Sequence, residues 1–158
     1  MTRKDELLAA FDDALNHAWE SIEYALSGLT DEEAAYQHKA YGDHPPEADG
    51  PLPGTALWHL VHLQGCYDYY TNGILSRPNA PVESSSTPAT MLSDAIGNMK
   101  LSRLRPRTTI ESLSEPQLDE ALGSGRAVIE LVRASIRHDA WHAGQIMVAR
   151  RLWRNRPQ

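Results

Sequence analysis

The sequence predicts an all-α protein, a four-helix bundle with long crossover loops. Apolar residues recur at steps of three and four in several long segments, which is the spacing of one helix face. Loops rich in proline, glycine and serine separate these segments, and no alternating run of useful length predicts a β-strand. A chain of 158 residues is expected to form one domain, residues 1–158, and to bury a sizeable core without disulfide bonds.

The first helix is predicted over residues 4–27, where an apolar stripe continues at helical spacing. Gly28 is expected to end this helix, and Thr30 to cap a short helical turn that follows it. The residues that form the stripe are Leu7, Leu8, Phe11, Leu15, Trp19, Ile22, Leu26 and Leu29.

A loop over residues 38–55 leads to the second helix, which Thr55 is expected to cap and Pro78 to stop. Residues 78–88 carry prolines and serines and are predicted to be a linker-like loop. The third helix follows that loop. We expect a kink or a break in it at Pro106, because proline removes a backbone donor and clashes with the preceding turn.

The third helical pattern extends to Leu113, and residues 114–117 begin another turn. Two glycines flank Ser124, which is predicted to be the N-cap of the last helix. That helix is expected to run to about Trp153. The fold therefore has its longest helix at the C-terminal end.

The charge and the cysteine content exclude several classes of protein. A net charge of −6 argues against a nucleic-acid-binding surface over the whole molecule. The one basic cluster, Arg150, Arg151, Arg154 and Arg156, is interpreted as the positively charged end of a helix. No segment predicts a signal peptide or a membrane span. The single cysteine, Cys66, agrees with a reducing setting, so a cytoplasmic protein is expected.

The last helix carries His138 and His142, four residues apart on its apolar stripe. A buried polar group costs free energy unless it finds a partner, and this spacing allows two imidazoles to reach one metal ion. With His62 from the second helix, three imidazoles would form a catalytic type of site with one open position. Zinc, nickel, iron and manganese all accept such nitrogen ligands. The alternative is that these are core histidines bonded to the backbone or to Asp139 and Gln145.

Two segments resemble the DinB/YfiT-like superfamily. Residues 57–63 (LWHLVHL) are similar to its second-helix pattern W-x-x-x-H-L, and residues 138–146 (HDAWHAGQI) to its fourth-helix pattern H-x-x-x-H-x-G-Q-I. The resemblance implies a four-helix bundle with a three-histidine site for a divalent metal, zinc or nickel first, and a homodimer. The positions matching its metal ligands are His62, His138 and His142. Pro106 departs from the regular third helix of the family.

Relatives in that superfamily imply a metal-dependent transferase that adds a low-molecular-weight thiol, such as mycothiol or bacillithiol, to a small electrophilic substrate. A hydrolase with metal-activated water is the alternative within the enzyme class. A non-catalytic metal- or ligand-binding bundle in a stress response is the alternative outside it. No membrane or nucleic-acid partner is expected.

Several neighbouring residues have competing interpretations. His59 lies one turn before His62 and competes with it as a ligand, and Cys66 lies one turn after it. Either residue would close the site as a fourth ligand, although Cys66 is interpreted first as a small buried hydrophobe. Asp139 is interpreted as a helix-surface residue or as an outer support of the site, and Gln145 as a group that orients His142 or packs against the first helix.

The remaining candidates receive structural interpretations. Gly144 is expected to allow a close approach between helices. The aromatic residues Trp58, Tyr69 and Trp141 line either a pocket or the core. His38 and His44 lie in a polar loop and are interpreted as surface histidines.

Overall fold

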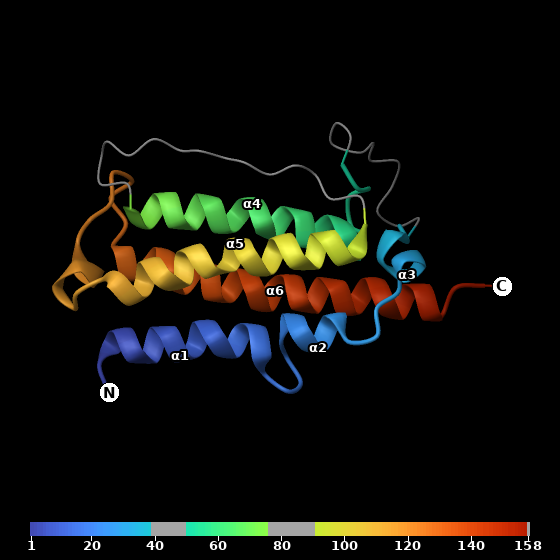
Figure 1. The fold of residues 1–158 in the computed structure, drawn as a ribbon, viewed down its shortest axis with the longest axis horizontal. Coiled ribbons are helices and arrows are strands. Elements are labelled where there is room, and N and C mark those ends of the chain that lie inside the picture. Colours follow the sequence, from blue (N-terminus) through green and yellow to red (C-terminus); the bar gives the residue numbers. More distant parts are fainter. Residues whose placement is uncertain (39–49, 76–90, 158) are drawn as a thin grey trace.

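The computed structural model describes residues 1–38, 50–75 and 91–157, and within these residues it is built from helices. Four long helices lie side by side along the length of the molecule (Figure 1), which confirms the predicted all-α fold. α4 packs against α5 and α6, whereas α1 and α2 pack along α6. The elements are α1 (Arg3–Asn16), α2 (Ile22–Leu26), α3 (Asp31–Ala35), α4 (Ala56–Leu75), α5 (Leu92–Ser112), the 3₁₀ helix η2 (Pro116–Asp119) and α6 (Val128–Arg154).

The core consists of two clusters of buried apolar side chains, one toward each end of the bundle. Burial of these side chains supplies most of the free energy that holds the helices together. The first cluster joins α2, α4, α5 and α6 through residues that include Ile22, Leu60, Leu63, Tyr67, Met99 and Ile146. The second joins α1, α4, α5 and α6 through residues that include Phe11, Ile74, Ile110, Leu118 and Val132.

Three threonines begin helices as their sequence positions indicate. The Thr30 hydroxyl accepts a hydrogen bond from Glu33 N at 3.2 Å, and the Thr55 hydroxyl accepts one from Trp58 N at 3.0 Å. Thr2 does the same for Asp5 N at 3.2 Å. Each contact satisfies one of the backbone donors that a helix leaves free in its first turn. The caps predicted at Thr30 and Thr55 are therefore confirmed.

The prediction of one helix over residues 4–27 is wrong. The chain leaves the α-helix after Asn16 and resumes it at Ile22 as α2. Ser21 causes the restart, because its hydroxyl donates to His17 O at 2.6 Å and accepts from Tyr24 N at 3.1 Å. Trp19, which the stripe predicted to be buried, is 72% exposed in the intervening loop.

The boundaries of the last two long helices also differ from the predictions. α5 continues through Pro106, so the chain does not break there. α6 begins at Val128 rather than after Ser124. Residues 121–127 instead form a turn in which Gly125 has φ +78° and Ala121 bridges Ala127. The predicted start of the third helix, at the end of the loop over residues 78–88, lies outside the described residues.

The basic end of α6 is tied into the bundle by a buried ion pair. Arg150 is 5% exposed, and its Nε lies 3.1 Å from Oε1 of Glu33, which is 3% exposed. Arg150 also donates to Ala25 O at 2.6 Å, and Arg154 reaches the same carboxylate at 3.1 Å. The interpretation of this cluster as a simple helix end is therefore incomplete, because these arginines connect α6 to α2 and α3.

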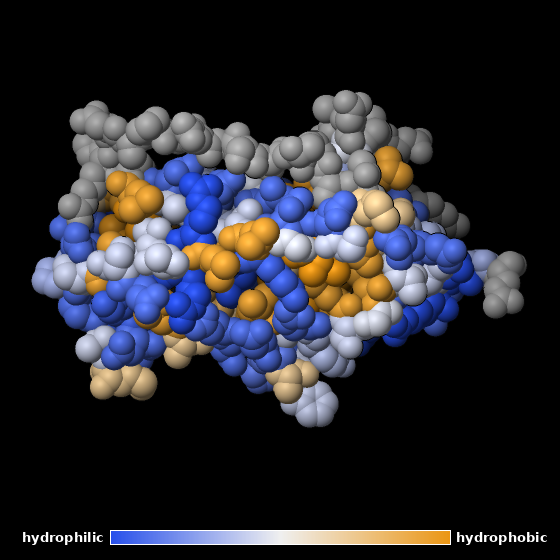
Figure 2. All heavy atoms as spheres, in the orientation of Figure 1, coloured by the Kyte–Doolittle hydropathy of each residue, from blue (hydrophilic) through white to orange (hydrophobic). Residues whose placement is uncertain are grey.

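Apolar side chains also reach the surface. Figure 2 shows hydrophobic side chains gathered along the middle of one face among hydrophilic ones. On α5, Leu101 and Leu104 are 67% and 56% exposed. None of the helices in the described residues combines the length and the apolar character that a membrane span requires.

Candidate metal centre

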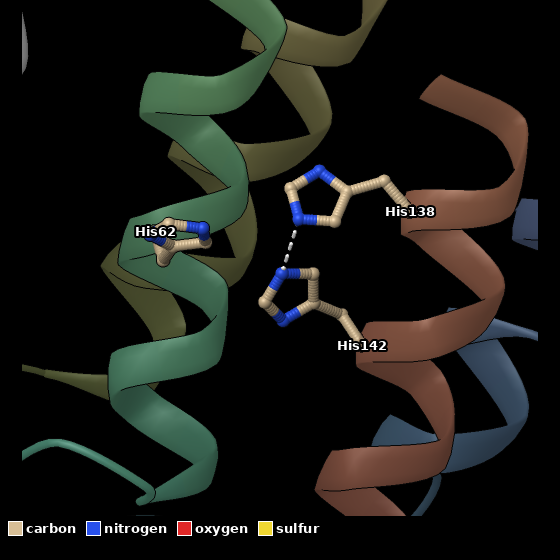
Figure 3. A group of neighbouring side chains, drawn as sticks. All are labelled: His62, His138 and His142. Carbon is tan, nitrogen blue, oxygen red and sulfur yellow. Dashed lines mark hydrogen bonds between the residues drawn. The ribbon is translucent and has the colours of Figure 1, made fainter. Parts of the chain in front are cut away.

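His62 on α4 faces His138 and His142 on α6, as Figure 3 shows. Each imidazole offers a nitrogen, and these three nitrogens lie within 4.8 Å of one another. The ring centroids are 4.5 Å apart for His138 and His142, and 5.0 Å for His62 and His142. The three histidines singled out in the sequence therefore form a group that could hold a metal ion. α4 supplies one residue and α6 the i, i+4 pair.

The two α6 histidines meet through corresponding nitrogens. Nε2 of His142 lies 2.9 Å from Nε2 of His138. Two unprotonated nitrogens at this distance would direct their lone pairs at each other. The contact is favourable only if one nitrogen carries a proton or if both nitrogens coordinate a cation. Neutral imidazoles with converging lone pairs are what a divalent metal requires.

A fourth histidine, His59, lies behind His142 rather than in the three-histidine group. The Nδ1 atoms of His59 and His142 are 2.9 Å apart. His59 is 3% exposed, and its Nε2 is buried without a hydrogen-bond partner among the described residues. His59 competed with His62 for the same role in the sequence, and the structure separates the two positions.

Tyr70, which the sequence analysis did not single out, contacts His138. Its hydroxyl lies 3.1 Å from His138 Nδ1, and the residue is 9% exposed. Helical spacing could have identified Tyr70 in the sequence. Three turns of α-helix span about eleven residues, so Tyr70 lies on the same face of α4 as His59. Tyr69, which was expected to line a pocket or the core, is 65% exposed instead.

Burial keeps the imidazoles of His59, His138 and His142 neutral. Desolvation, with a smaller contribution from His62, lowers the pKa of His59 to about 4. Desolvation, followed by the nearby His59, His138 and His62, lowers the pKa of His142 to about 2. The pKa of His138 is lowered by the same first cause. In the metal-free protein at neutral pH, these rings therefore have a free lone pair each, as metal ligation requires.

A pocket of about 320 Å³ lies beside His62. Trp58 forms part of its wall and stacks on the His62 ring, with centroids 4.8 Å apart and planes inclined by 14°. Gly65 and Cys66 line the next turn of α4. A Cβ atom added at Gly65 would meet nothing within 4 Å, so the missing side chain leaves this part of the pocket open.

Cys66 lies on the rim between the pocket and the histidines. Its Sγ is 3.3 Å from Nε2 of His62, and the residue is partly buried. Burial, with a smaller contribution from Asp139, raises the pKa of the Cys66 thiol to about 11. In the metal-free protein the thiol is therefore protonated at neutral pH. Its position agrees with either sequence interpretation, a small buried side chain or a fourth ligand.

Asp139 does not lie on the helix surface, so the first of its two sequence interpretations is wrong, whereas a role as an outer support of the site stays a prediction. It is fully buried, with Oδ2 3.0 Å from Nε of Arg103 and Oδ1 accepting from the Tyr67 hydroxyl at 2.8 Å. Desolvation raises the pKa of Asp139, whereas Arg103 and Tyr67 lower it. Both carboxylate oxygens are thus engaged by α4 and α5. This buried pair joins three helices next to the histidines.

The other residues that the sequence singled out are not part of the three-histidine group. Gly144 is exposed, and a Cβ there would meet nothing within 4 Å, so the predicted close helix approach is wrong. Trp141 is 53% exposed, with its ring centroid 6.2 Å from that of His138. Gln145 is half-buried on α6. His38 packs near Tyr36 outside the cluster, and His44 lies outside the described residues.

Comparison with known proteins places the chain in a family. The model of the DinB superfamily matches residues 14–146. In fold, the chain is similar to the crystal structure of the conserved protein of locus from Enterococcus faecalis, with a TM-score of 0.59 and 14% identity over 99% of each chain. Identity at this level shows a shared fold alone. No curated protein matches the sequence. The helical fold and the match over most of its length show that this chain belongs to the DinB superfamily.

Proposed function

We propose that His62, His138 and His142 bind one divalent metal ion and that the protein is a metal-dependent transferase, adding a low-molecular-weight thiol to a small electrophilic substrate. One observation carries the proposal: three imidazole nitrogens from two helices lie within 4.8 Å of one another. Zinc and nickel are the first candidates, and iron and manganese also accept nitrogen ligands.

The residues present fit such an ion. Burial keeps the rings of His138 and His142 neutral, and Trp58 stacked on His62 restricts rotation of the His62 ring. Three protein ligands leave one position of a tetrahedral site for a substrate. A metal bound there would supply a Lewis acid that lowers the pKa of a coordinated thiol or water. We assign the pocket beside His62 to the substrate, since one of the three proposed ligands, His62, forms part of its wall.

A closed, non-catalytic site is the second candidate, and the position of Cys66 supports it. The distance of 3.3 Å between Cys66 Sγ and His62 Nε2 would allow the sulfur to become a fourth ligand. A site of this kind would suit a binding or stress-response bundle. The hydrolase alternative uses the same three histidines with water in the open position. We further propose a homodimer, supported by the exposed Leu101 and Leu104 on α5. A cytoplasmic location is also proposed, on the ground that the chain has a single cysteine.

Metal content tests the proposal. Purified protein is expected to carry about one divalent ion per chain, measured by elemental analysis, and His138→Ala is expected to lose it. Cys66→Ser is the matched control. Unchanged metal content in this variant supports an open site, whereas loss of the metal favours the closed one. Folded wild-type protein that takes up no zinc or nickel would contradict the proposal. A screen of thiol cosubstrates with electrophiles then tests the transferase.

A further inference from the structure

We infer that His59 and Tyr70 are positioning residues that fix which nitrogen of His142 and of His138 faces the metal. The inference rests on the proposed function, since it concerns the same site. It goes beyond that function because it assigns a role to two residues that are not ligands. Both project from α4 toward the two candidate ligands on α6.

Each candidate ligand on α6 has two ring nitrogens, of which one can face a cation. The Nε2 atoms of His138 and His142 converge at 2.9 Å, so these are the atoms that can share one cation. If both Nε2 atoms coordinate, each neutral ring must carry its proton on Nδ1. A buried N–H needs an acceptor, or the ring loses a hydrogen bond that it had with water.

The structure provides one acceptor for each proton. Nδ1–H of His142 can donate to Nδ1 of His59 at 2.9 Å, and Nδ1–H of His138 to the Tyr70 hydroxyl oxygen at 3.1 Å. Each contact fixes both the tautomer and the rotation of its ring. Such outer contacts typically change metal affinity by 10- to 100-fold. The two contacts therefore preorganise the pair before an ion arrives.

His59 must then carry its own proton on Nε2. That atom is buried and has no hydrogen-bond partner among the described residues. A purely structural histidine in this core would be expected to satisfy both nitrogens. The unsatisfied nitrogen indicates that the position is adapted to the His142 contact rather than to the stability of the core.

The test is metal affinity, measured by competition between each variant and a chelator for zinc. Tyr70→Phe removes only the hydroxyl and is expected to weaken zinc binding roughly 10-fold. Tyr69→Phe, on the adjacent exposed tyrosine, is the matched control and is expected to bind as the wild type does. His59→Leu is expected to weaken binding 10- to 100-fold. Gln64→Leu, a buried polar residue on the same helix, is its control.

Rescue separates positioning from simple packing. In His59→Asn, the side-chain oxygen falls where Nδ1 of histidine lies, so this variant is expected to recover most of the affinity that His59→Leu loses. The visible absorption of bound Co²⁺ is expected to keep its coordination type in all of these variants. A changed coordination type in His59→Leu would show that His59 is itself a ligand and would overturn the inference.

The zinc affinities distinguish failure of this inference from failure of the proposed function. Equal zinc affinity in wild type, His59→Leu and Tyr70→Phe would overturn the inference and leave the metal site intact. Binding in His59→Asn as weak as in His59→Leu would also overturn it. Wild-type protein without zinc affinity would contradict the proposed function itself.

Discussion

Replacing Asp139 by asparagine tests whether this residue supports the bundle or the metal. The side chain is fully buried, and its partner Arg103 has a side chain that is only 4% exposed. Asparagine has nearly the same shape and keeps an oxygen for the Tyr67 hydroxyl. The change removes the negative charge, and it also removes the hydrogen bond from Arg103 Nε, because the amide NH2 group then replaces Oδ2. Arg103 cannot lose its proton, so it would become a buried cation without a counter-charge.

The expected cost follows from that uncompensated charge. Breaking a buried ion pair by removing one partner typically costs about 3–5 kcal/mol. Arg103 retains two favourable contacts, a hydrogen bond to Phe11 O and a position 3.9 Å from the centroid of the Phe11 ring, so we expect the lower part of that range. A typical domain is stable by about 5–15 kcal/mol, so Asp139→Asn should fold with much reduced stability.

Urea unfolding followed by circular dichroism measures this change, with chelator present so that metal does not contribute. The double variant Arg103→Met with Asp139→Asn removes both charges, and we expect its loss to be smaller than the sum of the two single losses by about 1–3 kcal/mol. Folded Asp139→Asn is expected to keep its full metal content, because both carboxylate oxygens contact Arg103 and Tyr67. A stability loss below about 1 kcal/mol, or loss of metal from folded protein, would refute this reasoning.

Two further predictions concern acid stability and the pocket. In the metal-free protein, the folded pKa of His59 is about 4, below the usual 6.5, so the unfolded chain binds more protons as the pH falls through this window. The contribution of His59 should therefore lower the free energy of unfolding by about 2 kcal/mol between about pH 7 and about pH 5. Urea unfolding midpoints that do not change between these pH values would contradict the buried neutral state of His59. Gly65→Ala should raise stability by about 0.5–1 kcal/mol, because alanine favours a helix interior and its Cβ would enter open space. Gly65→Leu should fill the pocket and reduce turnover with metal content unchanged; full activity in Gly65→Leu would place the substrate elsewhere.

Local pattern was sufficient to predict the fold class and the histidine pair of the last helix. Helical periodicity marks the long helices, and the i, i+4 spacing places His138 and His142 on one face of α6 whatever the rest of the chain does. The approach of His62 could not come from spacing, because it depends on how α4 packs against α6. The sequence offered His62 as a further histidine among apolar residues, and the family resemblance favoured it over His59.

The first helix shows why periodicity alone can mislead. The apolar spacing continues from α1 into α2, because both helices pack along α6. Ser21 nevertheless restarts the helix through its own side-chain hydrogen bonds. Local side-chain contacts of this kind compete with the helical backbone and leave the hydrophobic pattern unchanged. The spacing of apolar residues indicates which helix face is buried, but it does not indicate where the helical backbone is interrupted.

The burial of Asp139 was missed for a different reason. Asp139 follows Ser135 by four residues and precedes His142 by three, so helical spacing places it on the buried face of α6. Its charge favoured the interpretation as a surface residue, because a carboxylate is buried only where a partner balances it. Asp139 and Arg150 are tolerated there because Arg103 and Glu33 reach them from other helices. Their partners are distant in sequence, and spacing within one helix cannot identify them.

The charge balance of the cluster bears on what occupies the open position. The donor group found among the described residues consists of three histidines, which are neutral ligands. The buried carboxylate of Asp139 is already balanced by Arg103. A divalent cation held by three imidazoles would therefore keep both of its positive charges in a partly buried site. Such a site favours an anionic fourth ligand, a thiolate or a hydroxide, over a neutral one. This preference is common to the transferase and the hydrolase proposals, and the size of the pocket beside His62 decides which thiols can enter.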